Sequence, residues 1–573
     1  MHPPRVVRPC LAAFALVLVA LPGSAAAAAT ERTGRTERTG RLLVTLDQPQ
    51  GAAGAHAAAA VLARGGLRRD GAQVPQIGLV SVRPTGGRSL SALARVLRRQ
   101  PGVGSVDVER RHTLRFLPND PALTAPEVSL GTPPGTPLAW WVARSGLPVA
   151  WDIARGDGAL VAVIDTGVDS GHPDLSGKIA ETIDNDGIPT HGGAGSDENG
   201  HGTHVASLAC GAGDNAFGVV GSGLNCRLLI IKSDLSDGSV AHSIVQAADR
   251  GADAINMSFG TDGAMPAARA IAEAIDYAVS KDVVLVAAAA DSPVVVQGDP
   301  ANLLQPTGTG PDITAGRGLT VTAANFAEQR ASFAGRGSQI SLAAYGSFAD
   351  RTGAPGIFGA FPSNPTELEA GGGLLFPAPG CGCRATFLGD ARYAYLEGTS
   401  MAAPIVAGVA AMASRVNPDA KAADIIHALK QTATRPAGSG WNADLGWGIL
   451  DAGAAINAVR AIDRRPPESK LTGRTRVRGA RSFTLRWSGR DRATAGLQPS
   501  GVADYEVYRS ANRRPYKRIK RTAVTRLKVS VRPGSQYRYY TIAVDRAGNR
   551  EAMPSKPDLS TRVDGRAAAR GRR

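Results

Sequence analysis

This sequence has no long apolar run after its N-terminus and no recognisable nucleic-acid-binding motif. After the N-terminus, no segment has roughly 18 or more uninterrupted apolar residues, the length that a membrane-spanning helix needs. No RNA- or DNA-reading motif is present either. We therefore predict a protein that is released rather than anchored in a membrane, and that has no nucleic-acid partner.

Cysteine is scarce, with five in 573 residues. Cys10 lies in the N-terminal segment, so Cys210, Cys226, Cys381 and Cys383 remain for the folded protein, and four cysteines allow three pairings. We favour Cys210–Cys226, because these two flank one loop. Cys381 and Cys383 would close a tight, strained ring. Without a second pair or a nearby histidine, their CxC spacing is a weak zinc signal.

The N-terminus has the pattern of a secretory signal. Arg5 and Arg8 precede the apolar run Leu11–Leu21, and small residues follow, with a cleavage position near Ala26–Ala29. This pattern predicts a signal peptide at residues 1–29, a secreted, extracellular protein and an oxidising compartment that permits disulfides. Cys10 precedes the apolar run, so it does not have the position of a lipid-attachment cysteine.

Length and composition predict three or more folded units. A chain of 573 residues exceeds one ordinary domain, and a hydrophobic content of 43% is enough for a large core. The net charge is +16, with arginine accumulating around residues 465–532 and in the tail. This charge fits binding to an anionic polymer such as cell wall or nucleic acid. Arginine-rich codon usage on a solvated surface is the simpler explanation, and we prefer it.

The pattern of residues 41–110 predicts a small α/β unit with the element order βαββαβ. Residues 111–140 are rich in proline, which predicts a linker. The strand-like segments are RLLVTL, IGLVSV and GVGSVDVER, and the helix-like segments are AAGAHAAAAVLARGG and SLSALARVLRRQ. Such a unit says little about function by itself. Its position between a signal peptide and the next domain suggests a pro-domain, at residues 41–117, with a cleavage site in the linker.

Residues 118–462 predict an α/β domain. Continuous apolar strands that alternate with helices are typical of a parallel sheet covered on both faces. The strands are predicted near 158–167, 226–233, 253–260, 283–290, 318–325 and 338–346, and the helices near 203–210, 239–250 and 267–281. The Gly- and Pro-rich segment 350–395 matches no pattern that we can assign.

Residues 475–562 predict a β-sandwich, because short alternating strands recur at regular spacing. The segments GVADYEVYRS and TIAVDRAGN resemble a fibronectin type III module. A spacing role and a binding role both fit this module, and the sequence does not separate them. Residues 563–573 form a basic tail.

Three polar residues stand at the ends of elements in the α/β domain. Asp165 ends the strand in VAVIDTG, His201 opens a helix in ENGHGTHVAS, and Ser400 opens another in GTSMAAP. Reactive groups collect beyond the carboxyl ends of parallel strands. A serine nucleophile needs a base, a histidine can accept its proton at neutral pH, and a carboxylate holds the imidazole tautomer. Each residue alone could be a turn carboxylate or a helix cap, but the set in this order predicts acyl transfer.

The motifs DTGVD, HGTHVA and GTSMAAP resemble the three signatures of the subtilisin family of secreted serine proteases, peptidase family S8. The resemblance covers residues 118–462 and implies a three-layer α/β fold with a parallel sheet. It implies a serine endopeptidase that needs no cofactor for its chemistry and that acts on protein or peptide substrates. The upstream unit resembles the family's pro-peptide, which assists folding, inhibits the enzyme intramolecularly and is cut off by the enzyme itself.

The position that supplies a second oxyanion donor departs from the family pattern. The resemblance places the backbone N–H of Ser400 and the side chain of residue 291 at the oxyanion, where the family usually has Gly-Asn and this chain has Ala290-Asp291. An ionised Asp291 accepts hydrogen bonds only. A protonated Asp291 can donate if burial raises its pKa. One branch of the family's proprotein convertases resembles this chain in having Asp there.

The substrate groove follows from the same resemblance. Ser258, Phe259 and Gly260 are expected to line one wall of the pocket for the P1 side chain. Ala287, Ala288 and Ala289 are expected to line the other. Small apolar walls without a carboxylate imply acceptance of large apolar side chains. The alternative is that the three alanines belong to the core of the sheet.

Calcium is a further implication of the resemblance. Asp120, Asp174 and Asn215 match positions that supply oxygen ligands in calcium-binding members, and oxygen-rich loops suit this cation. Ordinary turn chemistry is the alternative, since Asp and Asn are favoured in loops. His204 follows His201 by one helical turn, but no third ligand is evident, so we interpret His204 as structural.

The sequence therefore predicts a secreted, self-maturing serine endopeptidase. One alternative is a catalytically weak or inactive protease-fold binding protein, with Asp291 as the sign of lost activity. A second is a cell-surface adhesion protein whose basic C-terminal module makes the contact.

Overall fold

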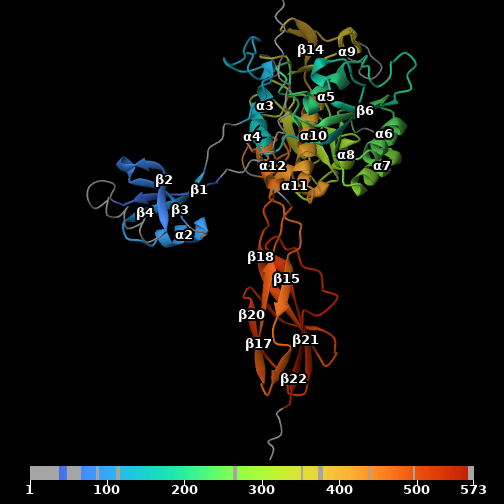
Figure 1. Ribbon diagram of the computed structural model, residues 1–573. Coiled ribbons are helices and arrows are strands. Elements are labelled where there is room, and N and C mark those ends of the chain that lie inside the picture. Colours follow the sequence, from blue (N-terminus) through green and yellow to red (C-terminus); the bar gives the residue numbers. More distant parts are fainter. Residues whose placement is uncertain are drawn as a thin grey trace, which may run out of the picture.

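The computed structural model divides the chain into three units, which Figure 1 shows from blue to red. It describes residues 38–47, 66–85, 89–110 and 116–565, apart from short gaps at 262, 264–267, 350–352, 372–378, 437, 439 and 495–496. The predicted signal peptide, most of the first helix predicted in the N-terminal unit and most of the basic tail lie outside the described residues.

The N-terminal unit is a four-stranded antiparallel sheet with one described helix. The sheet order is β2-β3-β1-β4, and the elements are β1 (Arg38–Leu46), β2 (Leu67–Val74), β3 (Leu79–Pro84), α2 (Leu90–Leu97) and β4 (Val103–Arg110). Leu42 and Val44 of β1 pack against Leu93 and Leu97 of α2 in a small core. The predicted βαββαβ pattern contains four strands, but no residues were assigned to β2, because this edge strand is mostly exposed and lacks an apolar alternation.

The central unit is built on a seven-stranded sheet in the order β11-β10-β9-β8-β5-β7-β6, with every described pair parallel. The strands are β5 (Leu160–Asp165), β6 (Ile179–Asn185), β7 (Arg227–Ser233), β8 (Ala254–Met257), β9 (Val284–Ala288), β10 (Leu319–Ala324) and β11 (Leu342–Tyr345). Six of these strands were predicted. β6 was not, because at the edge of the sheet its residues are mostly exposed.

Helices cover both faces of this sheet, which confirms the predicted three-layer architecture. On one face, α6 (Asp237–Asp249) and α7 (Arg269–Ser280) pack on the strands in one apolar cluster. On the other face lies a larger cluster, to which α5 (His201–Cys210) and α10 (Thr399–Val416) contribute. Further helices of the unit are α3 (Trp140–Arg144), α4 (Leu147–Trp151), α8 (Ala301–Leu304), α11 (Ala422–Thr432) and α12 (Ala452–Arg460).

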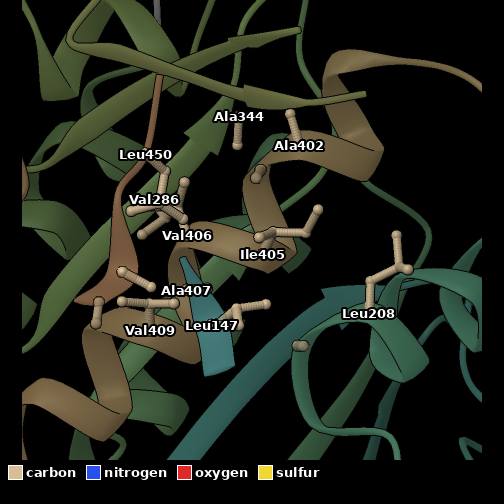
Figure 2. Close-up of a cluster of buried hydrophobic side chains, with 14 of the residues drawn as sticks. Leu147, Leu208, Val286, Ala344, Ala402, Ile405, Val406, Ala407, Val409 and Leu450 are labelled. Atoms are coloured by element: carbon tan, nitrogen blue, oxygen red, sulfur yellow. The ribbon is translucent and has the colours of Figure 1, made fainter. Parts of the chain in front are cut away.

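Helix α10 passes through the centre of the larger cluster. Its 18 residues are apolar enough to cross a membrane by length and composition, but 83% of that stretch is buried inside the protein. A helix that is apolar all round is buried in a core, and Figure 2 shows Ile405, Val406 and Val409 of α10 among side chains of the sheet and neighbouring helices. This packing fixes the position of the N-terminus of α10.

The segment that matched no pattern forms a small sheet beside α5. Strands β12 (Ile357–Ala360), β13 (Arg384–Phe387) and β14 (Asp390–Leu396) pair in the order β12-β14-β13, and α9 (Glu367–Ala370) lies between them in the chain. The Nε2 atom of His204 lies 3.0 Å from the carbonyl oxygen of Ile357. The N–H of Ala360 donates to Ser207 Oγ at 3.1 Å. The small sheet therefore braces α5.

Two disulfides join cysteines that are near in the chain. Cys210, at the end of α5, bonds to Cys226, just before β7. Cys381 bonds to Cys383 beside β13.

The C-terminal unit is a β-sandwich of a three-stranded sheet, β15-β17-β20, and a five-stranded sheet, β16-β22-β21-β18-β19. Its strands are β15 (Glu468–Thr472), β16 (Arg476–Arg478), β17 (Ser482–Arg490), β18 (Val502–Ala511), β19 (Lys517–Thr522), β20 (Arg526–Ser530), β21 (Gln536–Asp545) and β22 (Leu559–Asp564). Leu485, Trp487 and Tyr539 belong to the core between the sheets. The first strand starts at Glu468, seven residues before the predicted boundary.

Candidate active site

The three candidate residues of acyl transfer gather near the carboxyl ends of the strands of the central sheet. Asp165 is the last residue of β5, at its carboxyl end. His201 is the first residue of α5, and Ser400 is the second residue of α10. Helices α5 and α10 pack against each other and both contact β5. The tertiary structure thus gathers residues that are far apart in the sequence.

Asp165 and His201 form a buried pair. The Nδ1 atom of His201 lies 2.8 Å from Oδ1 of Asp165, and the exposed fractions of the two residues are 6% and 2%. Burial by itself disfavours the imidazolium ion. The charge and the hydrogen bond of Asp165 outweigh this effect and raise the pKa of His201 above its ordinary value. The ring is thereby held with Nδ1 toward the carboxylate.

A buried network positions this pair, and the sequence analysis missed it. Asp197 Oδ1 accepts hydrogen bonds from Thr166 Oγ1 and Gly200 N–H, each at 2.8 Å. Its Oδ2 accepts from the N–H and hydroxyl of Thr203 at 2.8 and 2.6 Å. The N–H of Thr166 in turn donates to Asp165 Oδ1 at 2.8 Å. Asp197 therefore ties the end of β5 to the start of α5.

Ser400 lies at the N-terminus of α10, where backbone N–H groups are free of helical partners. Its hydroxyl donates to the carbonyl oxygen of Ser258 at 2.9 Å, and the Ser258 hydroxyl donates back to the Ser400 carbonyl oxygen at 2.9 Å. Ser400 is 8% exposed. This reciprocal pair holds the serine turn against the end of β8, and the helix terminus favours negative charge beside it.

Asp291 lies at the same place. Its Oδ1 accepts from the N–H of Thr399 at 2.8 Å and from the Thr399 hydroxyl at 2.9 Å. A Cβ atom added to Gly398 would lie 2.9 Å from Asp291 Oδ2. Burial of the carboxyl group raises the pKa of Asp291, although the hydrogen bonds from Thr399 and the charge of His201 oppose the rise. The residue as a whole is exposed. Asp291 is thus next to the serine turn and within electrostatic reach of His201.

The expected pocket walls are only partly where the resemblance placed them. Phe259 and Gly260 reach the surface, while Ser258 is fully buried. Ala288 and Ala289 lie toward the end of β9 near Asp291. Ala287 is 0% exposed in the cluster under α6 and α7, which fits the alternative that this alanine belongs to the core of the sheet. Successive side chains of a strand point to opposite faces, so neighbouring alanines cannot share one wall.

The expected calcium ligands fall into two groups. Asp120 and Asp174 are buried, and one carboxylate oxygen of each has no hydrogen-bond partner. Loss of solvent raises the pKa of both groups, that of Asp174 to about 7. Asn215 is exposed, and its Oδ1 accepts from the N–H of Phe217 at 2.9 Å. The two orphaned carboxylate oxygens fit a cation, whereas the Asn215 side chain already caps its own turn.

His204 does not have the surroundings of a metal ligand. It is fully buried, its Nε2 meets the carbonyl oxygen of Ile357, and burial lowers its pKa to about 3. A neutral imidazole held by a backbone carbonyl is a structural group, as the sequence analysis proposed.

Comparison with known proteins finds relatives that include an extracellular protease. The chain is 31% identical to thermitase of Thermoactinomyces vulgaris over 324 residues, which span 55% of this chain and 92% of thermitase. It is 30% identical to subtilisin BL of Lederbergia lenta over 303 residues, 52% of this chain and 91% of that protein. An extracellular protease of Xanthomonas campestris is 29% identical over 409 residues, 64% of this chain and 61% of that protein.

The fold and the site define a serine hydrolase on a parallel α/β sheet. Residues 156–448, about half of the chain, match the model of the subtilase family, peptidase family S8. The chain belongs to the subtilase family and is a subtilisin-like serine endopeptidase.

Proposed function

We propose that this protein is a secreted endopeptidase that matures itself and cleaves proteins with Asp165, His201 and Ser400. The observation that carries this proposal is the buried Asp165–His201 pair, 2.8 Å apart, at the sheet edge where α10 presents Ser400. The Xanthomonas campestris relative is named an extracellular protease, which supports protein substrates.

The chemistry follows from the roles that these groups can fill. His201 Nε2 accepts the proton of the Ser400 hydroxyl as its oxygen attacks the peptide carbonyl carbon. Asp165 holds the ring through Nδ1 and stabilises the imidazolium. As the tetrahedral intermediate collapses, His201 gives the proton to the departing amine, which leaves an acyl-serine. Water, activated by the same imidazole, then releases the carboxylic acid and restores Ser400.

The oxyanion receives two donors in this proposal. One is the backbone N–H of Ser400, which lies at a helix N-terminus. The other is the side chain of Asp291 whenever Oδ2 carries a proton, since Thr399 already donates to Oδ1. Burial raises the pKa of Asp291, which favours this form, although the hydrogen bonds from Thr399 oppose the rise. Losing a comparable donor costs on the order of 10²–10³ in turnover, so the protonation state of Asp291 sets the rate rather than the type of reaction.

The N-terminal unit is proposed as the pro-peptide, at residues 41–117, cleaved by the enzyme itself and acting as its inhibitor until release. The secretory signal predicted at residues 1–29 supports export. The Xanthomonas relative is named an extracellular protease, which is consistent with it. Pro-peptide removal would leave Asp120 near the start of the mature chain.

Calcium is proposed as a structural ion, held by Asp120 and Asp174. Their orphaned oxygens would become ligands, and Ca²⁺ prefers such oxygen donors. The ion would supply charge neutralisation for two buried carboxylates and would take no part in peptide hydrolysis.

The deciding experiment compares the full-length secreted protein with Ser400→Ala near pH 8 with calcium. We expect the wild type to lose residues 41–117 and to hydrolyse casein, and the variant to do neither. If neither protein cleaves, Asp291→Asn separates the causes. Rescue would assign the defect to the oxyanion donor, whereas continued inactivity would favour a protease-fold binding protein.

A further inference from the structure

The C-terminal module carries nearly all of the net charge of the protein. Residues 468–564 contain 23 lysines and arginines and 8 aspartates and glutamates, a net charge of +15, while the whole chain has +16. Residues 1–467 contain 38 basic and 41 acidic residues. The tail after the module, residues 565–573, adds four arginines and no acidic residue. Arginine-rich codon usage would affect the whole chain, so it does not explain an excess that is confined to the module and this tail.

Within the module, the acidic side chains gather on the five-stranded sheet. Glu506 pairs with Arg550 at 2.7 Å and also with Arg518. Asp504 pairs with Arg521 at 3.0 Å. A further carboxylate, Asp564 of β22, pairs with Arg476 at 2.6 Å. The arginines of this sheet are therefore partly neutralised by their neighbours.

The outer face of the three-stranded sheet is different. Side chains of β15, β17 and β20 alternate between the core and solvent, which leaves one face exposed. We call this face the cationic face, and its exposed cations are Lys470, Arg486, Arg490, Arg526 and Lys528. Within the described part of the module, no ion pair of these five cations is found. The acidic residue on the face, Glu468, lies 4.0 Å from Arg492 instead.

The register concentrates this charge. Arg486 and Arg526 lie directly opposite each other on β17 and β20, and like charges in this position destabilise a sheet. Lys528 of β20 occupies the next row on the same face, opposite Thr484 of β17. Lys470 of β15, the strand that pairs with the other edge of β17, lies opposite Ser488. Rows on one face are about 7 Å apart. The cations thus form a band along the strands, and an anion bound between Arg486 and Arg526 would relieve their repulsion.

We propose that the cationic face binds a linear anionic polysaccharide. The face presents hydroxyl groups of Thr472, Thr484 and Ser488 between the cations, which suit the hydroxyls of a sugar chain. Among the described residues of this face there is no aromatic side chain on which a base could stack, as single-strand binders use. It has no helix or ribbon that would enter a duplex groove, and no exposed large apolar side chain that would enter a membrane.

The test uses full-length protein with Ser400→Ala, so that self-cleavage cannot remove the module. The face variant carries Lys470→Gln, Arg486→Gln, Arg526→Gln and Lys528→Gln. The control variant carries Arg513→Gln, Arg514→Gln, Lys517→Gln and Lys520→Gln, which are exposed cations around β19 on the other sheet. Both variants lose four charges, so they differ in location only. Circular dichroism checks that each is folded.

Binding to immobilised heparin, a sulfated linear polysaccharide, is measured as a function of NaCl concentration. We expect the affinity of the face variant to fall at least about tenfold at physiological salt, and its salt slope to fall by about one for each cation removed. The control variant should change less than about threefold. Neutral dextran should not bind.

Two results would overturn the proposal. If the control variant loses as much affinity as the face variant, net charge rather than the cationic face causes binding. If a poly-dT strand of about 20 nucleotides or vesicles of phosphatidylglycerol bind as tightly as heparin and compete with it, the face is a nucleic-acid or membrane surface. Because Ser400→Ala is inactive by design, neither result bears on the peptidase proposal.

Discussion

Asp165 acts on the proposed reaction through one atom of His201. Its Oδ1 lies 2.8 Å from Nδ1 of His201, and its carboxylate places a negative charge beside this buried ring. Burial lowers the pKa of His201, but Asp165, together with the charges of Asp197 and Asp291, raises it further than burial lowers it. The free base needed for catalysis therefore forms above the ordinary histidine pKa of about 6.5.

The first prediction concerns Asp165→Asn. Loss of the carboxylate removes the orientation of the imidazole, and kcat should fall by about 10⁴, as in other Ser-His-Asp enzymes. The pKa of His201 should also fall, because burial still lowers it and the nearest of the carboxylates that raise it is gone. The acid limb of kcat/KM against pH, measured on a chromogenic peptide, should move to lower pH in the variant. An unchanged limb would mean that His201 is not the titrating base.

The second prediction concerns Asp291. Asp291 can donate only while its carboxyl group is protonated. It loses this proton when the pH rises through its raised pKa, so activity should decline above that pH. Asp291→Asn donates at every pH and should raise kcat by up to about 10² while removing this decline. Asp291→Ala is the matched control and should be slower than Asn throughout. Equal rates for Ala and Asn would exclude residue 291 as a donor.

At the scale of elements, the loops that lead into the catalytic helix are held by buried charge. Lys232, near the end of β7, is 1% exposed. Its Nζ donates to the carbonyl oxygens of Gly192 and Ser196 at 3.1 and 3.3 Å and pairs with Glu198. Burial disfavours the Glu198 carboxylate, but its hydrogen bonds to Lys232 and Ser196 lower its pKa to about 2.

The third prediction is that Lys232→Met lowers the free energy of unfolding by about 3–5 kcal/mol, because it leaves partly buried groups without their cation. Urea denaturation of Ser400→Ala protein measures this loss. Arg250→Met is the control, because Arg250 and its partner Glu181 are both exposed. This substitution should lower the free energy of unfolding by less than about 1 kcal/mol. Similar losses for the two variants would show that Lys232 is not a special support.

The fourth prediction concerns Asp120, just before η2 (Pro121–Leu123), and Asp174 within η3 (Pro173–Leu175). Calcium at about a hundredfold excess over its Kd should stabilise the folded protein by about 2.7 kcal/mol. Asp174→Asn should remove most of this gain, measured as the rise in melting temperature on adding calcium. Asn215→Ala should keep it, because that side chain already caps its own turn. Equal stabilisation of all three proteins would place the ion elsewhere.

At the scale of the whole molecule, the peptidase and the C-terminal module have separate cores. The residues of the sandwich core lie within 471–563, and no residue of the peptidase core is among them. Polar contacts join the two units, such as the bond from Asn549 Nδ2 to the carbonyl oxygen of Asp463 at 2.8 Å. The charge is divided in the same way, since the module holds the basic excess.

The fifth prediction follows from this division. A chain truncated after Pro467 should keep kcat/KM on a short peptide within about twofold of the full-length value, because no residue of the proposed triad or of its support lies in the module. The truncated chain should also lose retention on heparin. A large fall in kcat/KM on the peptide would mean that the module is part of the active enzyme.

The sequence determined the fold class, the order of the elements and the three catalytic candidates, because apolar periodicity and short motifs are local signals. It could not assign residues to β2 or β6, since edge strands with exposed residues lack that periodicity. It also missed Asp197. Its bonds from Gly200 and Thr203 are local, but its role depends on the bond from Thr166, which exists only once the end of β5 lies beside the start of α5.

Three further features were decided by the tertiary structure alone. The placement of Ala287 in the core depends on which face of β9 it occupies. The small sheet of β12, β13 and β14 depends on packing against α5. The cationic face depends on the register that sets Arg486 opposite Arg526. Each is a relation between distant segments, and a linear sequence carries no local signal for it. Composition showed that the chain is basic, but only pairing across strands showed where that charge is left unpaired.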